Sequence, residues 1–149
     1  MVLFLLTGAG CFALCQFLRR KALEAAMPVE LKSGAVRLQR TVNKAGAGGI
    51  LGRHPALVTV FAALALVFTF GAALWGSREK QLSRGALWGL GLVAGGGASN
   101  LYERLRHGGV LDYIRFPKLP GKLGRLVFNP ADFGIFAGAL AVLWKELTR

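Results

Sequence analysis

The sequence predicts an all-α integral membrane protein with four transmembrane helices and a small β-containing segment between the first two helices. The chain has 149 residues, of which 54% are hydrophobic and only 17% are charged, whereas soluble domains carry about 25% charged residues. Four apolar segments follow one another, and an alternating, β-branched stretch, VRLQRTV, lies between the first and the second. So short a chain cannot bury this much apolar surface in a soluble core, and we expect one membrane-embedded domain, residues 1–149.

The predicted helices follow the four apolar segments and cover about residues 2–18, 55–75, 85–100 and 130–147. A straight helical span needs about 20 residues, and the third and fourth segments are short in apolar residues alone. Their polar ends must then reach the interface. This places Asn100 and Asp132 near a membrane surface.

Glycines repeat at a spacing of four in the third and fourth segments: Gly85 and Gly89, Gly91 and Gly95, and Gly134 and Gly138. Small residues at this spacing let membrane helices approach closely. The pattern therefore predicts a compact helix bundle.

The two long connections, about 19–53 and 101–128, follow the first and third helices and so share one face of the membrane. The polar residues of interest gather at this face: Asn43, Asn100, Asp112, Asn129 and Asp132. The net charge of +12 suits anionic lipid headgroups, because the basic residues sit between apolar runs. We expect no nucleic-acid partner.

The third helix runs into a polar stretch that contains Asn100, Glu103 and Arg104. If the helix continues, these residues and His107 line one side of it. A solvated helix end with a Glu–Arg pair explains the stretch equally well.

Asp112 lies in an apolar surrounding, GGVLDYIRF, and Asp132 lies in the stretch Asn129-Pro130-Ala131-Asp132. A helix start explains the second stretch, because Asn favours the N-cap, Pro the first helical position and an acid the first turn. Capping does not explain a second acid in the preceding loop, and acids near a membrane boundary are functional candidates. Two aspartates held close together share a proton, so that one takes a proton from water while the other polarises a carbonyl. This is peptide hydrolysis without a metal or a cofactor.

Three stretches in this region resemble the lipoprotein signal peptidase (signal peptidase II) family. NLYER from Asn100, GVLDY from Gly109 and FNPAD from Phe128 are similar to the family patterns N-x-x-D-R, G-x-V-x-D-F and F-N-x-A-D, in the same order between the third and fourth helices. The stretch VNKAGAGGIL, residues 42–51, resembles the family segment N-x-G-A-A-F, with Asn43 as its asparagine.

The resemblance implies that Asp112 and Asp132 are the catalytic pair and that five residues support them or bind substrate: Asn43, Asn100, Glu103, Arg104 and Asn129. It implies a monomeric, multi-pass protein of the bacterial cytoplasmic membrane, with both long segments and the active site on the extracytoplasmic face. The implied partners are membrane lipids and the substrate, a prolipoprotein carrying diacylglycerol on a cysteine. The cut falls just before that cysteine.

The chain departs from the family pattern at several positions, which indicates a divergent member. Glu103 stands where the family has Asp, and the helix-one motif is reduced to CQFLR, residues 15–19. Most Lys and Arg residues lie in the long connections, and the positive-inside rule would place these in the cytoplasm. The resemblance places them outside.

Two further readings remain open at this stage. Asp112, Glu103 and Asp132 carry oxygens that suit Mg²⁺, as in a metal-dependent membrane lipid transferase or phosphatase. The chain also fits a non-enzymatic membrane protein, an inactive relative of the family. Sensitivity to a chelator separates the first reading from a metal-free peptidase.

Overall fold

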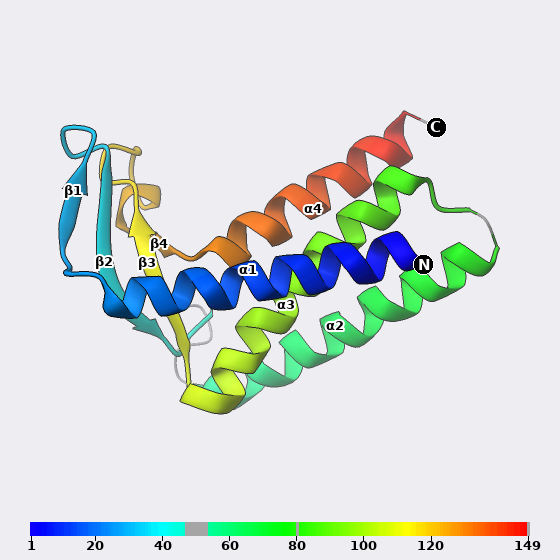
Figure 1. Ribbon diagram of the computed structural model, residues 1–149, viewed down its shortest axis with the longest axis horizontal. Coiled ribbons are helices and arrows are strands. Elements are labelled where there is room, and N and C mark those ends of the chain that lie inside the picture. The colour runs from blue at the N-terminus through cyan, green and yellow to red at the C-terminus, as the bar shows by residue number, and fades with distance from the viewer. Residues whose placement is uncertain (47–53, 80, 149) are drawn as a thin grey trace.

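The computed structural model describes residues 1–46, 54–79 and 81–148, and within them the protein is mostly helical with a small sheet at one end (Figure 1). Its α-helices are α1 (Val2–Glu24), α2 (Pro55–Arg78), α3 (Arg84–His107) and α4 (Pro130–Leu147). Its strands are β1 (Val29–Leu31), β2 (Val36–Asn43), β3 (Val110–Arg115) and β4 (Val127–Phe128), with a 3₁₀ turn, η2, at Leu123–Arg125.

Three helices continue past the apolar runs from which they were predicted: α1 reaches Glu24, α2 reaches Arg78 and α3 reaches His107. An apolar run marks the part of a helix that a bilayer can cover, whereas backbone hydrogen bonding extends the helix until a residue ends it. In α3 that residue is Gly108, which has a φ of 71° and so adopts the left-handed conformation common after a helix.

The helix α3 lies at the centre of the bundle and packs against α1, α2 and α4. Glycine makes the close approaches possible. A Cβ atom at Gly89 would lie 2.6 Å from the carbonyl oxygen of Gly138 on α4, and one at Gly91 would lie 2.8 Å from the carbonyl oxygen of Phe4 on α1. The glycine pattern is thus used at helix contacts, as predicted.

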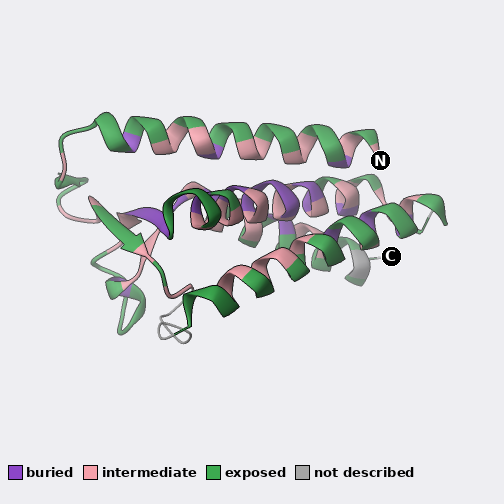
Figure 2. Cartoon of the chain, turned by 90° about the horizontal axis from the view of Figure 1, so that it is seen from below, coloured by how far each residue is buried: buried purple, intermediate pink, exposed green. Residues whose placement is uncertain are grey.

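The outer surfaces of α1 and α2 are apolar and exposed, while buried residues concentrate on α3 (Figure 2). Phe68 on α2 is 77% exposed, and only 11% of the most apolar stretch of either α1 or α2 is buried. Among the described residues, α1 and α2 are the two helices that are long and apolar enough to cross a membrane. An apolar exterior on such helices is typical of a surface that faces lipid.

The strands form one antiparallel sheet in the order β1-β2-β3-β4. The predicted β-containing segment between the first two helices is present as β1 and β2. The sequence-based prediction placed strands in this segment alone, and it is incomplete, because the second long connection supplies β3 and β4. The reason is that β2 needs a hydrogen-bonding partner along its second edge, and β3 provides it, with Thr41 opposite Asp112. The sheet lies at the end of the bundle opposite Met1 and the end of α4 (Figure 1).

Candidate active site

The start of α4 is built around Asn129, which caps the helix in the predicted manner. Its side-chain oxygen accepts hydrogen bonds from the N–H groups of Ala131 at 2.8 Å and Asp132 at 3.3 Å. The Asp132 carboxylate accepts the Asn129 N–H in return, at 3.0 Å, which completes a capping box. The helix start thus fixes Asp132 in its first turn.

The same asparagine also reaches Asp112. The side-chain amide nitrogen of Asn129 donates to Asp112 Oδ1 at 2.8 Å, and this bond is buried. Asn129 therefore binds both aspartates, one through its side chain and the other through its backbone. The sequence presented helix capping and a link between the two acids as alternative explanations. Asn129 does both, because it caps α4 and binds both aspartates.

Asp112 lies in β3 and is 3% exposed. Its second oxygen accepts a hydrogen bond from the side-chain amide of Asn43 at 2.9 Å. Asn43 ends β2 beside β3, and its own oxygen accepts the Ala45 N–H at 3.0 Å, which orients the amide. Both oxygens of this buried carboxyl are thus bound by neutral donors.

Asp132 is half-buried and is held from α3 as well as from its own helix. The side-chain amide of Asn100 donates to Asp132 Oδ1 at 3.2 Å. The predicted asparagines Asn43, Asn100 and Asn129 therefore all contact an aspartate. Elements from four parts of the chain, β2, α3, β3 and α4, meet at this point.

Arg104 and Glu103 take positions that the sequence did not specify. Arg104 Nη1 donates to the backbone oxygen of Asn43 at 3.4 Å. Glu103 is 3% exposed and faces α1 and β3, where its carboxylate accepts the Leu111 N–H at 2.9 Å. The Glu103–Arg104 pair of the alternative explanation, a solvated helix end, is not formed among the described residues, because Glu103 contacts β3 and α1 whereas Arg104 contacts the end of β2. Arg19 of α1 approaches Glu103 instead, at 3.1 Å.

Burial raises the pKa of Asp112 to about 6, against the opposing effect of its hydrogen bonds from Asn129 and Asn43. The negative charges of Asp132 and Glu103 raise this pKa further. A carboxyl in such surroundings is partly protonated near neutral pH, whereas an exposed one is not. Asp112 can therefore act as a proton donor, and it is linked to Asp132 through Asn129.

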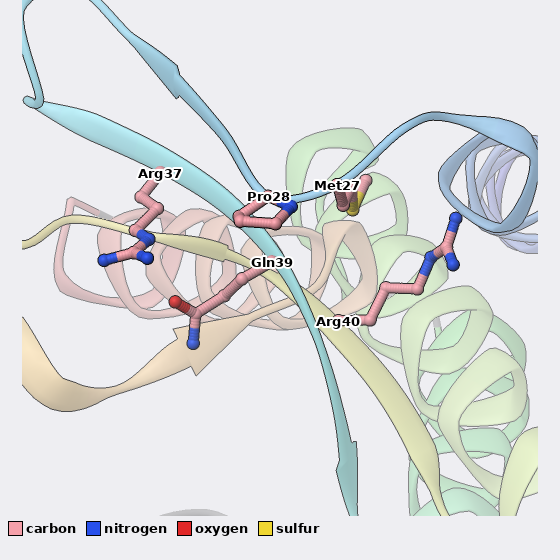
Figure 3. A pocket seen from close by; sticks show the side chains of 5 residues that line it. All are labelled: Met27, Pro28, Arg37, Gln39 and Arg40. Atoms are coloured by element: carbon pink, nitrogen blue, oxygen red, sulfur yellow. The ribbon is translucent and has the colours of Figure 1, made fainter.

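Three further features lie beside or away from this cluster. The predicted family segment, residues 42–51, is described only as far as Gly46, so its remainder lies outside the described residues. A cavity of about 400 Å³ lies between the segment before β1 and the strand β2, and it is lined by Met27, Pro28, Arg37, Gln39 and Arg40 (Figure 3). A second hollow, of about 630 Å³, has a largely apolar lining from α1, α3 and α4. Neither contains a predicted site residue.

No group of three His, Cys, Asp or Glu side chains is placed to hold a metal ion in the part of the chain that the structure describes. The two aspartates instead accept hydrogen bonds from side-chain amides and a backbone N–H group. Sequence reasoning proposed Glu103 but missed Arg19 as its partner. The one signal for Arg19 was its place at the end of the reduced helix-one motif.

Two solved structures, each described as a bacterial membrane enzyme, share this fold. One matches with a TM-score of 0.79 over 97% of this chain and 87% of that chain, and the other with a TM-score of 0.76 over 97% and 92%. Both are 17% identical in sequence to this chain. The likeness therefore supports the arrangement of helices and sheet.

Curated relatives that match in sequence are named lipoprotein signal peptidase. The protein from Pelotomaculum thermopropionicum is 47% identical over 60 residues, which is 40% of this chain and 36% of the relative. The proteins from Nitrobacter hamburgensis and Rhodopseudomonas palustris (strain TIE-1) are 39% and 37% identical, over 52% and 61% of this chain. The chain spans about half the length of these two relatives, 47% and 54%.

The family described as Signal peptidase (SPase) II matches residues 11–148, almost the whole chain. This range contains both aspartates and all three asparagines of the cluster. The motifs, the fold and this match agree, and the chain belongs to the signal peptidase II family.

Proposed function

We propose that this protein is a membrane aspartic endopeptidase that removes the signal peptide from diacylglyceryl-modified bacterial prolipoproteins, cutting just before the lipidated cysteine. The observation that carries the proposal is the double contact of Asn129, which binds Asp112 through its side chain and Asp132 through its backbone. Two acids tied to one residue at the end of a membrane helix are positioned for a shared task. The family membership supplies the substrate class.

In this proposal the two aspartates act as a pair that holds one proton. The ionised member takes a proton from a water molecule, and the water oxygen attacks the carbonyl carbon of the scissile bond. The neutral member gives its proton to the carbonyl oxygen, which forms a tetrahedral intermediate. As the carbon–nitrogen bond breaks, the aspartate that took the water proton passes it to the leaving amine, and the other aspartate regains a proton from a hydroxyl of the intermediate. The raised pKa of Asp112 favours its being the protonated member.

The supporting residues would hold the pair in place. Asn43 and Asn129 donate to Asp112, and Asn100 donates to Asp132. Arg104 holds the backbone at the end of β2. A neutral amide can hold a carboxylate without lowering its pKa as strongly as a cation does.

We propose that α3 and α4 cross the membrane together with α1 and α2, in a single domain that acts as a monomer in the bacterial cytoplasmic membrane. The sheet and the aspartates would then lie on the extracytoplasmic face, where β1 and β2 would cover the substrate. Lipids would contact the exposed apolar faces of α1 and α2. These faces carry large side chains such as Leu6 and Phe68, 68% and 77% exposed.

The test is cleavage of a synthetic diacylglyceryl-modified precursor by the purified protein in detergent. We expect cleavage by the wild type, and a loss of about a hundredfold to ten-thousandfold in rate for Asp112→Asn and for Asp132→Asn, since each removes one acid–base group. Mass spectrometry of the products locates the cut. A precursor without the lipid should remain intact.

The control is Glu24→Gln, which removes an exposed carboxylate, 65% accessible, that pairs only with Lys21 on the same helix. This variant should keep the wild-type rate. Addition of a chelator should leave the rate unchanged, whereas its loss would favour the metal-dependent reading. Full activity in either aspartate variant would refute the catalytic pair.

A further inference from the structure

Glu103 is the buried acid that the proposed mechanism does not use. Its side chain is 5% exposed and contacts β3 and α1. One of its oxygens, Oε2, accepts the Leu111 N–H at 2.9 Å and lies 3.1 Å from Arg19 Nε. Leu111 directly precedes Asp112. The Glu103 carboxylate of α3 is therefore hydrogen-bonded to the backbone directly before Asp112.

The Leu111 N–H lies beyond the part of β3 that another strand covers on that side. β4 pairs with Ile114 and Arg115 of β3 and extends no further along it. Leu111 is 7% exposed, so water has little access to its backbone. A buried N–H without an acceptor is destabilising, because it loses its hydrogen bond to water. Glu103 supplies the acceptor where the sheet does not.

Arg19 provides the charge that balances Glu103. Its side chain is 16% exposed, and a buried carboxylate is tolerated only when it is paired. The Nε atom makes no hydrogen bond among the described residues, so the contact is an ion pair without hydrogen-bond alignment. One turn earlier on α1, Gln16 donates to Ser99 of α3 at 2.9 Å. The two polar contacts fix the register of α1 on α3.

The end of α1 is also tied to the strand that carries Asn43. Arg40 of β2 donates to the backbone oxygens of Ala22, Leu23 and Ala25, at 3.1, 2.8 and 2.6 Å. Ala22 packs against Leu111 and Tyr113 of β3 in a small buried cluster. The strand that carries Asp112, β3, and the strand that carries its partner Asn43, β2, are therefore both attached to the same end of α1.

We propose that Arg19 and Glu103 form a positioning pair, which places Asp112 by holding the Leu111 N–H and so fixing β3 against α1 and α3. The proposal rests on the proposed function for its catalytic consequence, but the anchoring of Leu111 stands apart from it. Within the described residues, neither makes a hydrogen bond or ion pair with an aspartate, so both act through the backbone. Length matters as much as charge, because the glutamate must span from α3 to β3.

The first experiment measures anchoring without reference to activity. Hydrogen–deuterium exchange of the purified protein should show the Leu111 amide protected in the wild type. We expect its exchange to speed up about tenfold or more in Glu103→Ala and in Glu103→Asp, which keeps the charge but draws the carboxylate back. Glu103→Gln, whose carbonyl can still accept the bond, should exchange more slowly than Glu103→Ala. Unchanged exchange in Glu103→Ala overturns the proposal.

The second experiment measures cleavage of the lipidated precursor. A displacement of Asp112 on the order of 1 Å can lower the rate about a hundredfold, so we expect Glu103→Ala and Glu103→Asp to lose about tenfold to a hundredfold in kcat, with KM within about twofold. Arg19→Gln should also lower kcat, and Arg19→Lys should restore part of it. The matched controls are Glu24→Gln and Arg20→Gln, which change exposed residues of α1.

The outcomes separate this proposal from the proposed function. If the wild type does not cleave the precursor, the proposed function fails, and exchange at Leu111 still decides the anchoring. If the wild type cleaves and Asp112→Asn is inactive, but Glu103→Ala keeps its kcat or changes only KM, the positioning pair alone is refuted. Should Glu103→Ala not fold, Glu103→Asp and Arg19→Gln carry the same comparison.

Discussion

At the scale of single residues, the hydrogen bonds that hold the two aspartates come from amides rather than from cations. Asn43 and Asn129 each donate to one oxygen of Asp112, and Asn100 donates to Asp132. A neutral amide orients a carboxylate while leaving its proton affinity high, whereas a cation at the same distance would favour the ionised form. This choice of partners suits an acid pair that must share a proton.

The raised pKa of Asp112 predicts how stability changes with pH. Burial raises this pKa to about 6, from about 3.9 in an unfolded chain. The folded protein then binds the proton more tightly than the unfolded chain does. The resulting stabilisation, on the order of 3 kcal/mol, is complete below about pH 4 and is lost as the pH rises to about 6.

The Asp112→Asn variant has no titrating group at this position, so the difference in stability between the wild type and the variant reports the titration of Asp112. We expect the wild type to lose stability relative to the variant between about pH 4 and about pH 6, and the difference to stay constant at higher pH. Thermal unfolding in detergent across this range measures it. Glu24→Gln should track the wild type throughout. A difference between the wild type and Asp112→Asn that does not change with pH would contradict a raised pKa.

At the scale of elements, the sequence predicted what local pattern determines. The apolar runs located the helices, and the Asn-Pro-Ala-Asp stretch located the start of α4, because capping depends on neighbouring residues alone. The hydrogen bond between Glu103 and the Leu111 N–H was not predicted, nor were the hydrogen bonds from Arg40 to the end of α1. Both join elements that only the fold brings together, and neither leaves a spacing in the sequence.

The contact between α3 and α4 is an element-scale feature on which the site depends. A Cβ atom at Gly89 would lie 2.6 Å from the backbone oxygen of Gly138 and 3.0 Å from a Val142 side-chain carbon. Neither helix can give way without moving Asn100 relative to Asp132. We therefore expect Gly89→Ala to destabilise the protein by about 1–3 kcal/mol and to lower the cleavage rate.

The control for this prediction is Gly71→Ala on α2, where an added Cβ atom meets nothing within 4 Å. This variant should be as stable as the wild type or slightly more so, because Ala favours a helix over Gly. Thermal unfolding and precursor cleavage measure both variants. Equal behaviour of the two would show that the close approach at Gly89 is not required.

At the scale of the whole molecule, two rules give opposite orientations. Most basic residues lie in the long segments at the sheet end, which the positive-inside rule assigns to the cytoplasm. The proposed function requires that end to be extracytoplasmic. The rule counts charges on short, unstructured loops, whereas several of these residues have structural partners. Arg19 pairs with Glu103, Arg40 binds the end of α1, and Arg115 donates to the Gly124 oxygen at 2.7 Å.

Labelling of single cysteines in whole cells decides the orientation. In a background with Cys11→Ser and Cys15→Ser, we introduce Ser33→Cys between β1 and β2, or Glu79→Cys at the end of α2, where both positions are exposed. A membrane-impermeant maleimide should label the Ser33→Cys protein in intact spheroplasts and the Glu79→Cys protein only after permeabilisation. Precursor cleavage by each variant checks that the labelled protein is folded. The reverse pattern would place the aspartates in the cytoplasm, away from exported prolipoproteins, and the basic residues would then have set the orientation after all.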